Sequence, residues 1–174
     1  LKAMLAGLKA EDRVQLIAVD VNAVPMTKGF VKPAGDEIGE SLEKLDQRVP
    51  LGATDMEKAL QSVAGAFEEG ATSPKAVVYI GDGISSASFL GTETYESLVS
   101  DLVEKRIPVS VHAIGPKVNL RLLGALASQT GGRVVADWDK ERPEQAGADL
   151  AAAAEAPVLW PQQDEVVFPG GFEV

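Results

Sequence analysis

The sequence contains no cysteine and a single histidine, His112, among its 174 residues. Disulfide bonds, thiolate metal sites and cysteine nucleophiles are therefore excluded, as are zinc sites built from several histidines. His112 lies in an apolar run that is typical of a strand. We expect it to be a buried, hydrogen-bonded histidine with no catalytic role. The lack of cysteine leaves the redox compartment undetermined.

Basic residues are also few. The chain has 16 Lys and Arg against 26 Asp and Glu, which gives a formal net charge of -10. Nucleic acids and anionic membrane surfaces require a basic surface, so neither is expected as a partner. No apolar run approaches the roughly 18 residues that a membrane-spanning helix needs, so no direct membrane insertion is expected for this sequence. The acidic balance is compatible with divalent cations.

What the sequence does contain is an ordinary globular composition, with 45% hydrophobic and 24% charged residues. Short apolar runs alternate with segments of helical periodicity. Strands are predicted at 13–19, 75–81, 107–114 and 133–137, an edge strand at 23–31, and helices at 36–48, 55–69, 93–105, 119–132 and 143–156. Strands that are apolar throughout and alternate with helices are typical of a parallel sheet covered on both faces. The predicted fold class is α/β, with a doubly wound, mainly parallel sheet.

Two polar features fall where such sheets form binding sites, beyond the carboxyl ends of the strands. Asp82 ends the predicted strand 75–81 between two glycines, and Thr54 precedes the helix 55–69. Carboxylate and hydroxyl oxygens are natural ligands for a hard cation such as Mg²⁺. Structural interpretations stay open for both residues. Thr54 with Glu57 fits a capping box, and Gly-Asp-Gly is a good turn sequence.

Five segments resemble, in order and spacing, the von Willebrand factor type A domain: "RVQLIAVD", "LGATDMEKAL", "KAVVYIGDG", "IPVSVHAIG" and "LGALASQTGG". The resemblance covers roughly residues 1–137 and implies a Rossmann-like fold. It also implies a metal-ion-dependent adhesion site, to which this chain would contribute Thr54 and Asp82. The ion would be Mg²⁺, or another divalent cation such as Ca²⁺ or Mn²⁺. A protein partner would supply an Asp or Glu to it, and the module would not be an enzyme.

The sequence departs from that family in one large respect. The family's Asp-x-Ser-x-Ser motif is absent and would precede the helix that begins near Leu1, so we expect the site to be incomplete in this sequence. The family's first, central strand is missing with it. We therefore expect a gap between the strands at 13–19 and 75–81, or another segment in it, for which the tail 157–174 is the available candidate. A smaller departure is Gly81, where the family usually has Thr.

Both ends of the sequence are interpreted as truncated, so the compartment is not predicted, although an extracytoplasmic or membrane-associated full-length protein is compatible with it. We expect a domain of this type at 1–137 without its first strand, a helix and linker at 138–157, and the start of a β-rich segment at 158–174. The latter part resembles the segment after such domains in bacterial proteins related to inter-alpha-trypsin inhibitor heavy chains. In those proteins a vault-type (VIT) domain often precedes the type A domain.

Two alternatives remain at this point. "VDVNAV" and "GDGISS" resemble motifs of haloacid dehalogenase-like, Mg-dependent phosphatases, which would need Asp20 and Asp82 to converge on adjacent strand ends. In that case Asn22 stands where a second acid is needed, and Ser85 or Ser86 where a further one is expected. The other alternative is a structural scaffold whose metal site is not functional.

Overall fold

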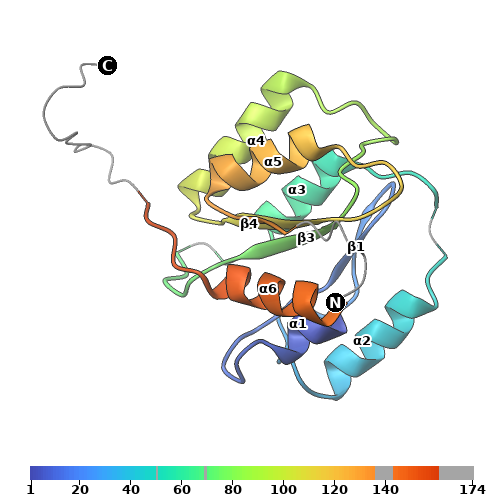
Figure 1. The fold of residues 1–174 in the computed structure, drawn as a ribbon, viewed down its shortest axis with the longest axis vertical. Coiled ribbons are helices and arrows are strands. Elements are labelled where there is room, and N and C mark those ends of the chain that lie inside the picture. The colour runs from blue at the N-terminus through green and yellow to red at the C-terminus, as the bar shows by residue number, and fades with distance from the viewer. Residues whose placement is uncertain (50, 69, 136–142, 161–174) are drawn as a thin grey trace, which may run out of the picture.

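The computed structural model describes residues 1–49, 51–68, 70–135 and 143–160. Figure 1 shows helices on both sides of a central sheet, with β1 beside it. Among the described residues, no helix is both long and apolar enough to cross a membrane.

The central sheet is parallel and has the order β3-β4-β5. Its strands are β3 (Val77–Gly81), β4 (Val109–Ala113) and β5 (Val134–Val135). Val77 pairs with Val109, and Val111 pairs with Val134. The parallel sheet is therefore confirmed. The partly buried His112 joins two of its strands, because its Nδ1 lies 3.1 Å from the carbonyl oxygen of Val135. The expected hydrogen bond is therefore present, but His112 is only partly buried and not buried as expected.

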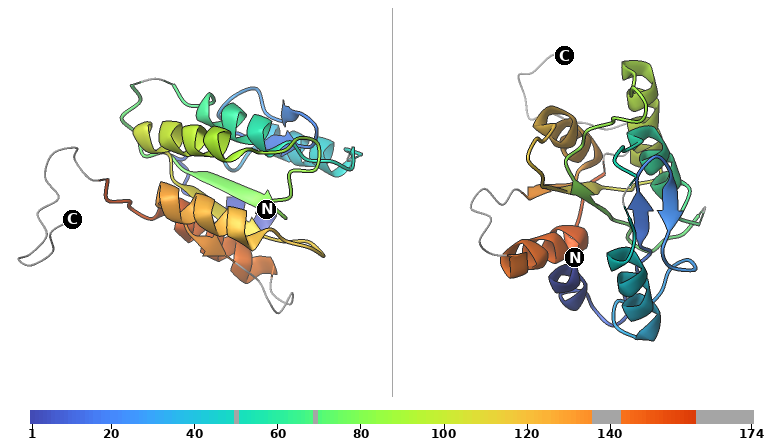
Figure 2. Two further views of the ribbon diagram at one scale, coloured as in Figure 1. Left: turned by 90° about the horizontal axis from the view of Figure 1, so that it is seen from above. Right: turned by 90° about the vertical axis from the view of Figure 1, so that its right-hand side faces the viewer.

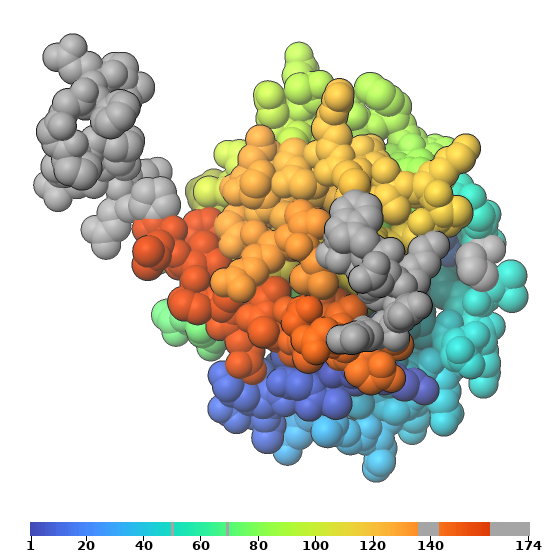
Figure 3. All heavy atoms as spheres, in the orientation of Figure 1, coloured from blue at the N-terminus to red at the C-terminus, as the bar shows by residue number. Residues whose placement is uncertain are grey.

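Helices cover both faces of this sheet, as a doubly wound fold requires (Figure 2). One face carries α3 (Met56–Ala64), α4 (Thr92–Glu104) and α5 (Leu120–Thr130), which pack on β4 around fully buried Leu102, Val109, Val111, Leu123 and Leu126. The other face carries α6 (Pro143–Glu155), with α1 (Lys2–Ala6) beside it. Figure 3 shows these two helices in contact at the surface. Their close packing depends on Gly147, because a Cβ there would lie 2.5 Å from that of Ala3.

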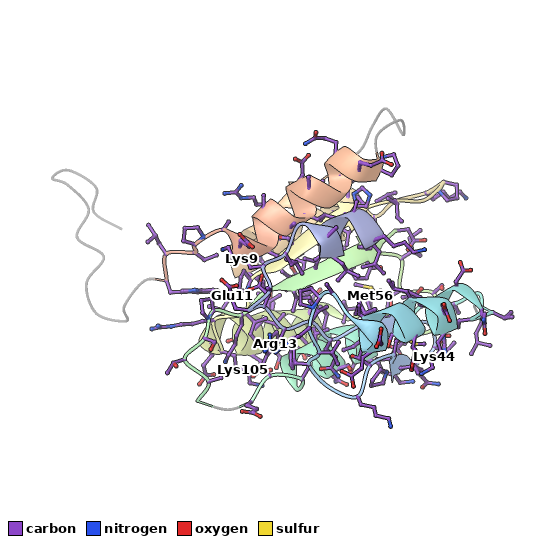
Figure 4. The ribbon with its side chains drawn as sticks, turned by 90° about the horizontal axis from the view of Figure 1, so that it is seen from below. Lys9, Glu11, Arg13, Lys44, Met56 and Lys105 are labelled. Carbon is purple, nitrogen blue, oxygen red and sulfur yellow. The ribbon has the colours of Figure 1, made fainter. Side chains whose placement is uncertain are left out.

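A second, two-stranded sheet lies to one side of the central sheet. β1 (Ile17–Val19) and β2 (Ala23–Pro25) form an antiparallel pair, which agrees with the expected short antiparallel edge strand. The helix α2 (Asp36–Asp46) packs beside them through a small core of Leu5, Leu16, Val31 and Ile38. Ser41 of α2 donates a hydrogen bond to the carbonyl oxygen of Met26, 3.0 Å away. Figure 4 shows Lys44 of α2 at the surface and Met56 of α3 in the interior.

The two sheets are not joined. β1 pairs only with β2, and β3 pairs only with β4, among the residues that the structure describes. Because the Val77 N–H donates to Pro108 on the β4 side, Val78 and Ile80 present their backbone groups to the opposite side. The hairpin bonds of Asp20 and Met26 similarly direct the backbone groups of Ile17 and Val19 away from β2. No described strand pairs with these edges of β1 and β3, so the described residues leave the expected gap open. Of the tail 157–174, residues 161–174 lie outside the described residues.

Several element ends differ from the predicted ones. α3 ends at Ala64 with Gly65 as its C-cap, five residues before the predicted end at 69. β1 begins at Ile17, and Val14 makes only an isolated bridge to Val31. α5 agrees closely with its prediction, because Asn119 caps it and Gly131, in the left-handed conformation, ends it. The last two residues of the strand predicted at 133–137 lie outside the described residues.

Candidate metal site at the strand ends

The structure joins the two loops that carry the predicted site residues. The backbone N–H groups of Ser86 and Ala87 donate to the carbonyl oxygen of Thr54, at 2.9 and 3.0 Å. In return, the Thr54 N–H donates to Ser86 Oγ at 3.0 Å, and the Met56 N–H donates to Ser85 Oγ at 3.1 Å. Four hydrogen bonds therefore hold the loop after β3 against the start of α3, and Thr54 and Asp82 lie on neighbouring loops.

Asp82 follows β3 directly, and hydrogen bonds hold both its backbone and its side chain. Its carbonyl oxygen accepts from the N–H of Asn119, the cap of α5, at 2.8 Å. Its Oδ1 accepts from the N–H of Ile84 at 2.9 Å, which closes the turn predicted for Gly-Asp-Gly. No cationic side chain pairs with this carboxylate, and no hydrogen bond reaches its Oδ2, within the part of the chain that the structure describes.

Gly83 is required at the next position for two reasons. Its φ of +70° lies in the left-handed region that residues with a Cβ rarely adopt. In addition, a Cβ there would lie 2.6 Å from Cγ of Leu123, a fully buried residue of α5. The glycine therefore lets the loop turn tightly against α5 and keeps Asp82 at the end of its strand.

Thr54 does not cap α3, so the capping-box interpretation is wrong. The N-cap is Asp55, whose carboxylate accepts from the N–H of Lys58 at 3.1 Å. Thr54 cannot take that role because its backbone is held by the loop after β3. The Thr54 hydroxyl makes no hydrogen bond to any described residue and is half-buried. Glu57, the other half of the proposed box, instead accepts from Gln61 Nε2 at 3.1 Å.

The Asp55 carboxylate is buried and charged. Burial raises the pKa of this carboxyl group, but the hydrogen bond from the Lys58 backbone and the Lys58 ammonium outweigh burial, so the pKa is lowered. Lys58 Nζ lies 3.4 Å from Asp55 Oδ2. The buried Ser88 hydroxyl lies beside this carboxylate but makes no well-formed hydrogen bond to a described residue, so we assign the shift to Lys58. Asp55 is therefore a helix cap and not a free ligand.

Asp20, the nucleophile of the phosphatase alternative, is already engaged. Its Oδ1 accepts from the Asn22 N–H at 3.0 Å, and its Oδ2 lies 2.5 Å from Arg48 Nη2. The Asn22 hydrogen bond and the Arg48 pair lower the pKa of this buried carboxyl group. Asp20 also follows β1, which is not adjacent to β3 in a sheet, so the strand arrangement required by the phosphatase interpretation is not observed.

Few side chains could bind a metal ion at the carboxyl ends of the strands, which we call the rim. Among the described residues, no three His, Asp or Glu side chains gather where they could hold a metal ion. Thr54 and Asp82 supply one hydroxyl and one carboxylate, which is a partial set for Mg²⁺, an ion that takes few protein ligands and keeps several waters. Sequence reasoning missed the two serines that tie the loops together, although "SS" three residues after Asp82 was a visible polar signal.

Comparison with known proteins agrees with this architecture. The model of a von Willebrand factor type A domain family matches residues 1–136. A solved von Willebrand factor type A protein from Catenulispora acidiphila has a TM-score of 0.75 at 14% identity, over 88% of this chain and 36% of that one. This chain thus spans about a third of that relative. The conserved hypothetical protein BatB from Bacteroides thetaiotaomicron has a TM-score of 0.65 at 15% identity, over 87% of this chain and 82% of that one.

A third solved structure, the SpRpn10 VWA domain, has a TM-score of 0.56 at 15% identity, over 85% of this chain and 76% of that one. A search of curated proteins found no match. At these identities the solved structures show the fold alone, whereas the family model covers most of the chain. The chain therefore belongs to the von Willebrand factor type A domain family.

Proposed function

We propose that this chain is a non-enzymatic protein-interaction module whose binding depends on a divalent cation, with Thr54 and Asp82 among the cation's ligands. A carboxylate from a partner protein completes the coordination. The family of this chain consists largely of interaction modules, which supports the general class. The metal dependence and the partner's carboxylate are the specific parts of the proposal.

One observation carries it. The Thr54 hydroxyl and the Asp82 Oδ2 are both without a hydrogen-bond partner among the described residues, and they lie on loops that are tied together by hydrogen bonds. Two other carboxylates, the buried Asp20 and Asp55, are each paired with a basic side chain. No described basic side chain compensates the charge of Asp82, in contrast to Asp20 and Asp55.

The chemistry of these oxygens suits a hard cation. Mg²⁺ and Mn²⁺ bind carboxylate and neutral oxygens, and Mg²⁺ retains water at the remaining positions. A water on such an ion is the position that a partner's Asp or Glu can take. Because the ion is then the strongest local charge, removing it abolishes the attraction for the partner. The remaining ligands must come from groups other than those described in this chain, in agreement with the absent Asp-x-Ser-x-Ser motif.

Metal-dependent capture of partner proteins tests this function. The full-length protein, immobilised in magnesium, is expected to retain partners that EDTA releases. Asp82→Ala should abolish that retention, and Thr54→Ala should weaken it. Lys32→Glu, which changes an exposed charge, is the control and should leave it intact. Partners that stay bound through EDTA and through both substitutions at the rim would refute the metal-dependent function and favour a scaffold without a working ion site.

A further inference from the structure

Beside the rim, on the α5 side, the surface is hollowed along an apolar groove. One hollow of about 230 Å³ is lined by Ile84, Ser85, Phe89, Leu90, Asn119 and Leu122. A second, of about 260 Å³, shares Leu90, Asn119 and Leu122 with the first and continues past Thr92, Tyr95 and Arg121 to Ala125. Because they share three residues, the two hollows form one groove between the loop after β3 and α5, which we call the α5 groove.

The α5 groove contains an aromatic side chain that the fold does not use. Phe89 is 91% exposed, although an aromatic ring can bury on the order of 150–250 Å² in an interface. The end of the groove is fixed, because the Tyr95 hydroxyl donates to Gln129 Oε1 at 2.8 Å. The floor is fixed as well, because Asn119 caps α5 and donates its N–H to the carbonyl oxygen of Asp82. An exposed aromatic anchor over a fixed apolar floor is a typical setting for a binding hot spot.

The charge of the groove differs from that of the rest of the chain. No acidic side chain lines either hollow, although the chain carries a net charge of -10. The one charged lining residue is Arg121, which lies exposed in the first turn of α5 and has no ion-pair partner among the described residues. The positive end of the α5 dipole lies at the same place. The Arg121 end of the groove therefore favours a ligand with negative charge next to an apolar side chain, whereas the Asp82 carboxylate lies beside the Ile84 end.

We infer that the α5 groove binds a peptide segment of a partner protein in which an aromatic or aliphatic residue stands next to Asp or Glu. The apolar residue packs against Phe89, Leu90 and Leu122, and the carboxylate pairs with Arg121. This site does not contain Thr54 or the Asp82 side chain. It needs no cation, so the inference stands or falls separately from the proposed metal-dependent function.

The test is selection of a random heptapeptide library, displayed on phage, against the full chain in EDTA. The expected result is enrichment of peptides that combine an apolar residue with adjacent Asp or Glu. Phe89→Ser and Arg121→Glu should each weaken the best selected peptide about tenfold or more, the loss typical of a central hot-spot residue. Both residues are exposed, and circular dichroism of each variant verifies that the fold is kept.

Matched controls separate this groove from general stickiness. Leu159→Ser removes an apolar side chain that is 97% exposed beyond α6, and Lys32→Glu reverses an exposed charge outside the groove. Neither substitution should change the affinity of the selected peptides. The inference would be overturned if the selected peptides bound the Phe89→Ser variant equally well or shared a basic consensus. It would also be overturned if the selection enriched no peptides at all. Binding that requires magnesium, or a Phe89-dependent dimer in sedimentation experiments, would assign the groove to the ion site or to a second copy and also overturn it.

Discussion

The start of α3 offers a sharp test, because two adjacent residues, Thr54 and Asp55, compete for the same structural role. Only Asp55 holds it: its carboxylate accepts from the Lys58 N–H at 3.1 Å, whereas no hydrogen bond to the Thr54 hydroxyl exists among the described residues. Replacing each by alanine therefore separates a helix cap from a residue kept free for another purpose.

The expected magnitudes differ clearly. Loss of an N-cap costs about 0.5–2 kcal/mol, and loss of a partly exposed ion pair adds about 0–1 kcal/mol. For Asp55→Ala we therefore expect the free energy of unfolding to fall by about 1–3 kcal/mol. For Thr54→Ala we expect a change within about 0.5 kcal/mol, as for substitutions that remove no buried contact. In a chain of this size, 1 kcal/mol corresponds to about 2–4 °C in Tm.

Urea and thermal unfolding followed by circular dichroism measure both variants, with Asp55→Asn as the matched control. Asparagine caps as well as aspartate does, so this control should recover most of the cap contribution and lose only the charge. A Thr54→Ala variant that loses as much stability as Asp55→Ala would refute the assignment of the cap. It would also remove the argument that the Thr54 hydroxyl is available to a cation.

Three further predictions concern packing and charge. Gly83→Ala should destabilise the chain by about 2–4 kcal/mol in urea unfolding, because its φ of +70° and a Cβ 2.6 Å from Leu123 combine backbone strain with overpacking. Gly147→Ala should cost about 1–3 kcal/mol, because its Cβ would lie 2.5 Å from a side chain of α1; a gain of helix stability would contradict the close packing of α1 and α6. The pKa of Asp20 is lowered from its ordinary 3.8, so the pair with Arg48 stabilises the fold above that pH and is lost as the pH falls below it. Asp20→Asn should therefore flatten the loss of Tm below about pH 4, and an unchanged acid profile would contradict this.

Features that depend on nearby residues were predictable from the sequence. The limits of α5 follow from Asn119 and Gly131, because a capping side chain and a left-handed glycine act within one turn of the helix. The parallel strands were predictable as well, because strands buried on both faces are apolar throughout. The gap in the sheet was predictable only from the family resemblance, because the family's first strand is absent from this sequence.

Features that depend on distant residues were not predictable. Thr54 and Asp55 are both good capping residues, and only the loop after β3, more than thirty residues along the chain at Ser86, decides between them. The pair of Asp20 with Arg48 joins residues that are 28 positions apart, and no local pattern indicates it. The sheet edge at which the loops of Thr54 and Asp82 lie was predictable, whereas the hydrogen bonds that tie these loops together were not.

The gap between β1 and β3 has an energetic consequence. Ile17, Val19, Val78 and Ile80 direct backbone N–H and C=O groups into it without a partner among the described residues. A fully buried group of this kind costs on the order of 1–3 kcal/mol. These four residues are partly buried, so a fraction of that cost applies to each group. We therefore predict that the chain alone is only weakly stable and that an added strand in this gap stabilises it.

The most direct test of the account is the effect of magnesium on the Tm of the chain with an N-terminal extension that carries an apolar strand and an Asp-x-Ser-x-Ser loop. We predict cooperative unfolding at a higher temperature than for residues 1–174 alone. At a hundredfold excess of Mg²⁺ over its Kd, linkage adds about 2.7 kcal/mol, or roughly 5–11 °C. Asp82→Ala in the extended chain should abolish that magnesium response. An equal response in the Asp82→Ala variant, or in residues 1–174 without the extension, would contradict the account.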